Sequence, residues 1–403
     1  MSSALLYHVT AVRGYRLTKA EPDGLGLLLF VEPLPHRVRC PCCGSKDVMR
    51  RGGKERWFRA LPVGARLTWI VATIPRVECV ECGVVRQINH GLAAPRRTYT
   101  HAFARYALEL SRRMTIKDVA RHLAVSWDTI KEIQKEHLRR HYARPKLKHV
   151  REIAIDEICI GRGHRYVTVV LDLGSGAILF VGRGKKAESL RPFWRRLRRS
   201  KAKINAVAID MSAAYISAVT ENLPDAAIVF DRFHIVKLMN EKLTVLRREL
   251  YHEATAQQKQ VLKGSRWLLL KRPDNLDASR DEVGRLYAAL RLNESLATAY
   301  YLKEELRQFW EQPDKRHARQ ALRSWYFQAK ASGIRVLIEM ANTLAAHEYG
   351  ILAWYDHPIS TGPLEGTHNK TKTMQRQHYG LRDEEFFKLK LYSLHETHYA
   401  LVG

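Results

Sequence analysis

Two short cysteine motifs constrain the fold of this chain more than any other feature of its sequence. Residues 40–44 and 79–83 each follow the pattern Cys-x-x-Cys-Gly. Each turn of this kind can point two thiolates at one Zn²⁺, and its glycine lets the backbone come close to the metal. The sequence therefore predicts a structural zinc site. Its predicted ligands are Cys40, Cys43, Cys79 and Cys82.

Two alternatives to this assignment stay open. Cys42 stands between the first two cysteines and competes with either of them as a ligand, and the cysteines could also be incidental. The 35 residues between the two pairs exceed the roughly 15–20 that are usual for such sites. Residues 66–74 alternate between apolar and other side chains, which is typical of a strand, so we expect an extended hairpin between the two turns.

The net charge of the chain points to a polyanionic partner. Lys and Arg number 68 against 41 Asp and Glu, a formal charge of +27, while 46% hydrophobic residues exclude a disordered basic tail. Nucleic acid and an acidic membrane surface both fit this charge. No apolar run approaches the roughly 20 residues of a membrane span, so we expect a cytoplasmic protein without a membrane segment. Residues 1–150 hold 28 Lys and Arg against 12 Asp and Glu, as a DNA-docking part would.

Residues 114–133 have the pattern of a helix-turn-helix. Thr115 and Ser126 can each cap a helix, and apolar positions at helical spacing follow each cap. The expected buried positions are Val119, Ala120, Ile130 and Ile133. The start of the second helix would enter the major groove of DNA with Trp127, Asp128, Thr129 and Lys131. A plain helical hairpin has a similar pattern and remains the alternative.

The middle of the chain changes from helical to alternating periodicity. Strands are predicted at 152–160, 166–173, 177–182, 204–210 and 226–230, with helices at 187–200 and 213–221. Three strands followed by two helix–strand pairs is the element order of a ribonuclease-H-like core. Short strands are expected before residue 35, and residues 232–350 are predicted to be nearly all helical, with a break at 264–277.

These patterns predict a multidomain protein that combines α+β and α/β parts. The predicted segments are 1–97 (strands and zinc ribbon), 98–148 (helix-turn-helix), 149–240 (first part of the ribonuclease-H-like core), 241–350 (helical insertion) and 351–403 (last part of the core).

Three acidic residues are the candidates for catalysis. Asp156 lies inside the first predicted core strand, Asp210 ends the fourth, and Glu365 begins a late helix behind Pro363. A carboxylate in an apolar strand is costly to bury unless a cation or hydrogen bonds compensate. Three carboxylates can hold two divalent ions at a phosphodiester. Mg²⁺ is the ion that best suits a site made of oxygen ligands alone. Either aspartate could instead be an ordinary exposed residue at the edge of the sheet.

The helix of Glu365 also presents polar and cationic side chains that fit a phosphate track. His368, Asn369 and Lys372 follow Glu365 at helical spacing, and a solvated helix face is the alternative. The DNA contacts predicted on this helix are Lys370, Lys372 and Arg376.

Together these motifs resemble the transposases of the bacterial insertion-sequence family written ISL-three. The resemblance rests on the zinc ribbon, the helix-turn-helix, residues 208–211 with Tyr215, residues 229–237, residues 262–267, and residues 362–366 with Asn369 and Lys372. It implies a DDE transposase with Asp156, Asp210 and Glu365 as the acidic triad, binding Mg²⁺ or Mn²⁺. It also implies that the amino-terminal modules bind terminal inverted repeats of double-stranded DNA, that the freed 3′-hydroxyl attacks target DNA, and that the active complex is at least a dimer.

The resemblance adds auxiliary candidates and leaves two other functions open. Asp231 and His234 either assist the metal site or cap the following helix, and Asn369 is a further auxiliary residue. Arg266 and Trp267 are candidates for DNA contact, and the alternative for Trp267 is a place in the core. The main alternative function is a non-catalytic DNA-binding regulator derived from a transposase. An RNA-directed nuclease is the other, although it leaves the helix-turn-helix unexplained. A bacterial transposase would work in the cytoplasm at the nucleoid.

Overall fold

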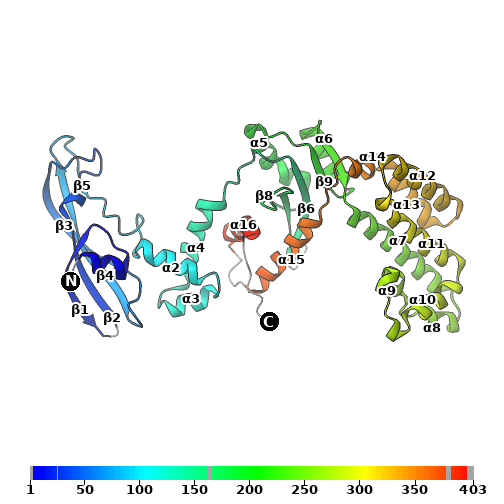
Figure 1. The fold of residues 1–403 in the computed structure, drawn as a ribbon, viewed down its shortest axis with the longest axis horizontal. Coiled ribbons are helices and arrows are strands. Elements are labelled where there is room, and N and C mark those ends of the chain that lie inside the picture. Colours follow the sequence, from blue (N-terminus) through cyan, green and yellow to red (C-terminus); the bar gives the residue numbers. More distant parts are fainter. Residues whose placement is uncertain (1–2, 25, 162–164, 378–382, 397–403) are drawn as a thin grey trace. The chain divides into compact units, whose positions relative to one another are not determined.

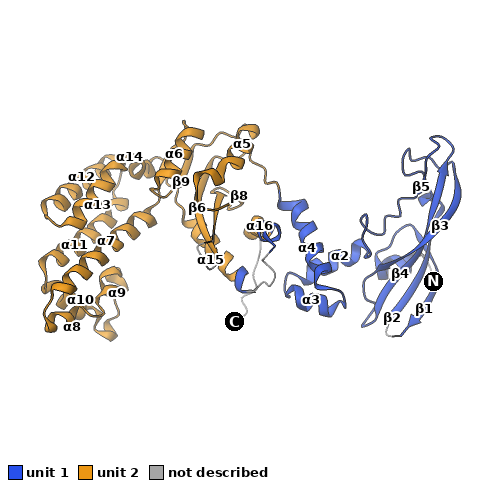
Figure 2. Cartoon of the chain, turned by 180° about the vertical axis from the view of Figure 1, so that it is seen from behind, with its two compact units in different colours: residues 1–143, 374–389, 396–403 blue, residues 144–373, 390–395 orange. Residues whose placement is uncertain are grey.

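The computed structural model describes residues 3–24, 26–161, 165–377 and 383–396 (Figure 1). The chain divides into two compact units, coloured separately in Figure 2. Unit 1 comprises residues 1–143, 374–389 and 396–403, and unit 2 comprises residues 144–373 and 390–395. This division into two units does not test the five predicted segments, which remain predictions.

Unit 1 begins with a five-stranded sheet in the order β1-β2-β4-β3, with β5 paired to β4. Its elements are α1 (Ser3–Thr10), β1 (Tyr15–Asp23), β2 (Gly26–Pro33), β3 (Val48–Arg59), β4 (Leu67–Cys79) and β5 (Val85–Gln87). β3 and β4 pair antiparallel, which confirms the hairpin predicted between the two cysteine turns. Tyr15, Phe58 and Ile70 are fully buried in the core of this sheet.

The prediction of strands alone before residue 35 is wrong for residues 3–10. This segment is helix α1, because it buries Leu6 and because the Thr10 hydroxyl donates to the carbonyl oxygen of Leu6 one turn earlier, at 2.6 Å.

The helix-turn-helix forms as predicted, from α2 (His101–Leu110), α3 (Ile116–His122) and α4 (Trp127–Tyr142). The hydroxyl of Thr115 accepts the Asp118 N–H at 3.2 Å, and that of Ser126 accepts the Thr129 N–H at 3.2 Å, so both predicted caps are confirmed. The four predicted core positions of this motif are buried.

A segment from the far end of the chain completes the core of these helices. α16 (Glu384–Tyr392) begins in unit 1, and its residues Phe386 and Leu389 are buried among Phe103, Ile130 and Ile133. The helix-turn-helix core therefore depends on residues about 250 positions away in the sequence.

Unit 2 contains the second five-stranded sheet, in the order β10-β9-β6-β7-β8. Its elements are β6 (Glu152–Gly161), β7 (Arg165–Asp172), β8 (Ile178–Arg183), the short helix at Ala187–Leu190, α5 (Arg191–Ser200), β9 (Ala206–Ile209), α6 (Ala213–Asn222) and β10 (Ala227–Phe230). The element order is the predicted one. The first and fourth strands, β6 and β9, are parallel neighbours, as expected.

A helical region follows β10 in unit 2, as predicted, and α7, α11, α12 and α13 pack against one another in it (Figure 1). Its helices are α7 (Arg232–Glu253), α8 (Ala256–Leu262), α9 (Ser265–Leu270), α10 (Glu282–Arg291), α11 (Glu294–Gln308), α12 (Lys315–Ala331), α13 (Arg335–Ala346) and α14 (Glu348–Leu352). The predicted break at 264–277 is wrong in part, because α9 forms within it after Gly264, whose φ of 82° starts the helix. Within the described ranges, no helix is long and apolar enough to cross a membrane.

Candidate functional site

The parallel strands of unit 2 bring three aspartates level with one another. β6 pairs with β9 and β9 with β10, and extending both registers places Asp156, Asp210 and Asp231 side by side. Asp210 and Asp231 directly follow β9 and β10, so the sheet offers a row of carboxylates at one edge. The predicted meeting of Asp156 and Asp210 therefore has a backbone basis.

Asp156 is the carboxylate of this row that meets the late helix α15 (Gly362–Gln377). Its Oδ1 accepts the Glu157 N–H at 2.7 Å, and its Oδ2 lies 3.7 Å from Nε2 of His368. Burial raises the pKa of Asp156, and the nearby charges of Asp210 and Asp231 act in the same direction. Because His368 follows Glu365 by one helical turn, this contact brings the helix of Glu365 to the strand of Asp156.

Glu157, the acidic neighbour of Asp156, is engaged with a different element. Its Oε1 accepts a hydrogen bond from the hydroxyl of Tyr215 in α6 at 2.7 Å. Burial raises the pKa of Glu157, and the hydrogen bond from Tyr215 partly offsets that effect. Of the two adjacent acids, Asp156 is thus the one in contact with α15.

Asp231 and His234 form a buried pair at the start of α7. Asp231 is 2% exposed, and its Oδ2 accepts the Phe233 N–H at 3.1 Å, while Nδ1 of His234 lies 3.3 Å from the same oxygen. The Asp231 carboxylate raises the pKa of His234, and the charge of Asp156 adds to this effect. Asp231 therefore caps α7, and capping this helix is one of the two roles predicted for the Asp231–His234 pair.

Asp231 also holds the segment that leads into α15, a contact that sequence reasoning missed. Its Oδ1 accepts the N–H of Thr361, which is 4% exposed, at 3.0 Å. The carbonyl oxygen of Thr361 in turn accepts the N–H groups of Leu364 and Glu365. The position of the first turn of α15, and hence of Glu365, is linked through Thr361 to the end of β10.

The three predicted catalytic carboxylates do not form a closed ligand group. Glu365 is exposed in the first turn of α15. Within residues 3–24, 26–161, 165–377 and 383–396, only the four cysteines place three or more ligand atoms within 4.8 Å of one another. Asp156, Asp210 and Glu365 nevertheless all offer oxygen atoms, the donor type that Mg²⁺ and Mn²⁺ take, and the burial of Asp156 favours a compensating cation.

The cysteine turns of unit 1 form the predicted tetrad. Sγ of Cys40 lies 3.6 Å from Sγ of Cys82, and Sγ of Cys43 lies 3.5 Å from Sγ of Cys79. Cys42 is exposed and lies outside this group, so its competing assignment is not supported. Four thiolates at such spacing fit a structural Zn²⁺.

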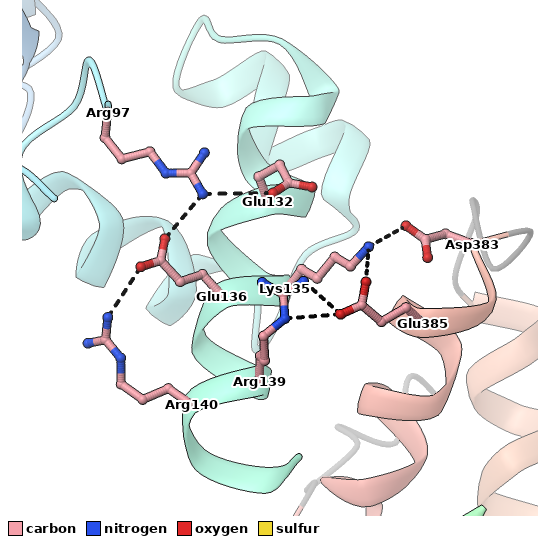
Figure 3. A network of polar contacts seen from close by, with 8 residues as sticks. All are labelled: Arg97, Glu132, Lys135, Glu136, Arg139, Arg140, Asp383 and Glu385. Carbon is pink, nitrogen blue, oxygen red and sulfur yellow. Dashed lines mark hydrogen bonds and ion pairs between the residues drawn. The ribbon is translucent and has the colours of Figure 1, made fainter. Parts of the chain in front are cut away.

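Figure 3 shows that ion pairs hold the middle of α4, residues 132–140, on two sides of the helix. On one side Lys131 and Lys135 each place Nζ 3.0 Å from Oδ2 of Asp383, and Arg139 lies 2.7 Å from Glu385. The predicted DNA contact Lys131 is therefore paired with an acid, and its Nζ also lies 5.3 Å from the centre of the Trp127 ring.

On the other side of α4, Arg97 lies 3.8 Å from Glu132 and 3.4 Å from Glu136 (Figure 3). The start of the helix is less enclosed. Asp128 is exposed, while Trp127 and Thr129 are half-buried. Asp128 is thus exposed in the first turn of α4, and Arg139, Arg140 and His141 are exposed in its last turn.

The remaining predicted DNA contacts lie at exposed positions. Lys370, Lys372, Arg376 and the auxiliary Asn369 are exposed on α15. Trp267 is 64% exposed on α9 and the guanidinium of Arg266 lies 4.8 Å from its ring centre, so the reading of Trp267 as a core residue is wrong. Its leucine neighbours Leu268 and Leu269 take the buried positions instead.

Comparison with known families agrees with this arrangement of modules. Residues 153–391 match the DDE domain profile of ISL3 described as "Transposase". Residues 89–138 match the "Helix-turn-helix domain of transposase family ISL3", and residues 36–82 match the "zinc-finger of transposase IS204/IS1001/IS1096/IS1165". The fold and its modules thus define a DNA transposase, an enzyme of the DDE class.

The chain belongs to the ISL3 family of insertion-sequence transposases. It is 33% identical over 380 residues to the transposase for insertion sequence element IS1001 of Bordetella parapertussis, with 93% of each chain covered. It is 28% identical over 394 residues to the transposase for IS1557 of Mycobacterium tuberculosis, covering 90% of this chain and 87% of that protein. A Drosophila P element transposase strand transfer complex is more distant, with a TM-score of 0.33, 10% identity and coverage of 60% of this chain and 76% of that one.

Proposed function

We propose that this transposase cleaves DNA at the ends of an insertion sequence and joins the freed 3′ ends to target DNA through Asp156, Asp210 and Glu365. The observation that carries the assignment is the 3.7 Å approach of His368 to Asp156, because it brings the helix of Glu365 to the strand pair that positions both aspartates. The sheet order with β6 next to β9 supports a ribonuclease-H-like core for unit 2.

The three carboxylates would hold Mg²⁺ or Mn²⁺. When bound, the metal would activate the attacking oxygen and stabilise the leaving oxygen at a phosphodiester. His368 and His234 lie beside Asp156 and Asp231, where they orient these carboxylates. Asp231 fixes the entry into α15 through Thr361 and thereby positions Glu365.

The other modules would hold the DNA. The zinc ribbon and the helix-turn-helix would bind the terminal inverted repeats, with the first turn of α4 reading bases. Lys370, Lys372 and Arg376 on α15, with Arg266 and Trp267 on α9, would line the path of the phosphate backbone to the acids. Pairing of two element ends requires at least a dimer, and the substrate directs the protein to the bacterial nucleoid. We also propose that the segments 1–97, 98–148, 149–240, 241–350 and 351–403, predicted from the sequence, are the domains of the chain.

A cleavage assay on a duplex that carries the inverted repeat flanking the gene tests this proposal. With Mg²⁺, Asp210→Asn is expected to slow cleavage by about 10³-fold or more, because a metal ligand contributes several kcal/mol to the transition state. Asp172→Asn is the matched control, because Asp172 ends β7 and its carboxylate accepts hydrogen bonds from its own turn, at Gly174 and Ser175.

Two outcomes would contradict the proposal. Undiminished cleavage by Asp210→Asn would remove the assigned triad. Binding of the inverted repeat by the wild type, with no cleavage of it under Mg²⁺ or Mn²⁺, would favour the non-catalytic regulator.

A further inference from the structure

A cavity in unit 1 is lined by cationic side chains and by no carboxylate. It has a volume of about 440 Å³ and lies where the end of α1 meets the start of α2. Its basic lining residues are the three arginines Arg13, Arg37 and Arg105, together with His101. In the described part of the chain, none of these four side chains has an acidic ion-pair partner. Such a concentration of unpaired positive charge favours an anionic ligand.

Two of the arginines are held in fixed positions. The guanidinium of Arg13 lies 4.4 Å from the centre of the Tyr7 ring and donates to the Tyr7 hydroxyl. Nη2 of Arg37 donates to the carbonyl oxygen of Arg13 at 3.2 Å. Ordering these long side chains before a ligand arrives removes part of the entropy cost of binding.

Two glycines make room for Arg37. A Cβ at Gly14 would lie 2.3 Å from Nε of Arg37, and a Cβ at Gly91 would lie 2.7 Å from its Nη1. Both glycines have positive φ, of 81° and 64°. The backbone therefore forms a passage in which the Arg37 side chain runs to the cavity.

The helices around the cavity add to its preference for an anion. His101 and Arg105 stand one turn apart at the start of α2, whose N-terminal dipole favours negative charge. At the end of α1, the carbonyl oxygen of Leu6 already accepts the Thr10 hydroxyl and that of Tyr7 accepts the Ala11 N–H. These carbonyl groups therefore oppose a bound anion less than free ones would.

We propose that this cavity binds a phosphate of the DNA backbone and thereby anchors the duplex beside the helix-turn-helix. This inference rests on the proposed binding of DNA by unit 1. Arg13, Arg105 and His101 are exposed, so a phosphate on the surface of a duplex can reach these side chains. α2 shares its core with the helix pair α3–α4, and the first helix of such a pair crosses the DNA backbone in other helix-turn-helix proteins. Charge-assisted hydrogen bonds from arginine suit a phosphodiester.

The experiment compares full-length, zinc-loaded variants in DNA binding without added magnesium. The test variant is R13Q/R37Q/R105Q, and the matched control is R16Q/K19Q/R112Q, which removes the same charge from residues of unit 1 that are paired with Glu32, Glu21 and Glu109. Fluorescence anisotropy is measured over a range of salt concentrations on an inverted-repeat duplex and on an unrelated duplex of equal length.

The test variant is expected to bind both duplexes about tenfold more weakly. The slope of log affinity against log salt should fall by about 0.9 for each phosphate that the variant no longer neutralises. Equal effects on the two duplexes are expected because a phosphate contact carries no sequence information. Arg105→Gln alone, at an exposed helix position, should show part of the effect even if the triple variant folds poorly.

Three results would overturn the phosphate site. These are a salt slope equal to that of the control variant, a weakening confined to the inverted-repeat duplex, and a thermal shift of the wild type by inorganic phosphate without any change in DNA binding by the variants. Because binding is measured without magnesium, these results are independent of the Asp210→Asn cleavage assay, so the phosphate site and the catalytic triad can each fail while the other stands. A wild type that binds neither duplex would instead contradict the proposed DNA binding by unit 1.

Discussion

Asp231 illustrates how one buried side chain can hold the starts of two helices. It is the last member of the aspartate row, and both of its oxygens are used: one accepts the N–H of Phe233 and the other accepts the N–H of Thr361. These bonds and the neighbouring His234 outweigh burial and lower the pKa of Asp231. A charged carboxylate can therefore persist there, with the starts of α7 and α15 fixed to it.

Asp231→Ala is expected to destabilise the chain by about 2–3 kcal/mol. The substitution removes a helix cap and leaves the N–H of Thr361 buried without an acceptor. Urea unfolding of the full-length chain, followed by circular dichroism, measures the loss. Asp231→Asn retains an oxygen for Thr361 and should lose clearly less; equal losses for the two variants would refute the role of the Thr361 contact.

The residue patterns that the sequence made predictable are the local ones. Asp156 and Asp210 stand out because each carboxylate sits in or at the end of an apolar strand, and the strand order then makes the two neighbours. The link from Asp231 to Thr361 spans 130 residues, and a threonine before Gly362 carries no signal of it. Trp267 was ambiguous because helix α9 is only six residues long, too short for its apolar face to be recognised by periodicity.

At the scale of elements, α4 is defined by more than its own sequence. Its caps and apolar positions predict the helix. Its basic side chains suggest a surface that faces DNA, but in the structure they pair with acidic side chains from the C-terminal segment. Lys131 and Lys135 share Asp383. Lys135 and Arg139 share Glu385 (Figure 3). Sequence reasoning missed this network because its partners lie about 250 residues apart.

The Asp383 contacts should make stability depend on pH at the acidic end. Burial would raise the pKa of Asp383, but the Phe386 N–H and the ammonium groups of Lys131 and Lys135 hold it well below its usual range. For a carboxylate with a lowered pKa, the stabilisation is present above the ordinary value of about 4 and is lost as the pH falls toward the value in the folded state.

Asp383→Asn is accordingly expected to cost about 2 kcal/mol between pH 5 and pH 8, with the difference from the wild type shrinking below about pH 4. Thermal unfolding of both proteins across this range provides the measurement. The Asp118→Asn variant, whose exposed ion pair with Arg121 spans 4.0 Å, serves as the control and should differ little from the wild type. A pH-independent cost of Asp383→Asn would mean that the charge of this residue is not what stabilises the helix pair.

At the scale of the whole molecule, the C-terminal segment contributes to both units. Phe386 is fully buried in the helix-turn-helix core of unit 1, and the Tyr392 hydroxyl accepts the N–H of Val181 in the sheet of unit 2 at 3.3 Å. Composition and charge made a basic DNA-binding part and a separate catalytic part predictable. They carry no information on such a return of the chain, because long-range packing of a few apolar residues leaves no periodic pattern.

This return of the chain predicts that a C-terminal substitution impairs the N-terminal DNA-binding part. Phe386→Ala removes a fully buried aromatic side chain and should cost about 3–5 kcal/mol, a large fraction of the 5–15 kcal/mol that typically stabilises a protein. Limited proteolysis should then cut within residues 101–142, and affinity for duplex DNA should fall with it. Phe327→Ala is the matched control, because Phe327 is 75% exposed on α12 of unit 2. If Phe386→Ala left both protease resistance and DNA affinity at the level of Phe327→Ala, the helix-turn-helix would be stable without the C-terminal segment.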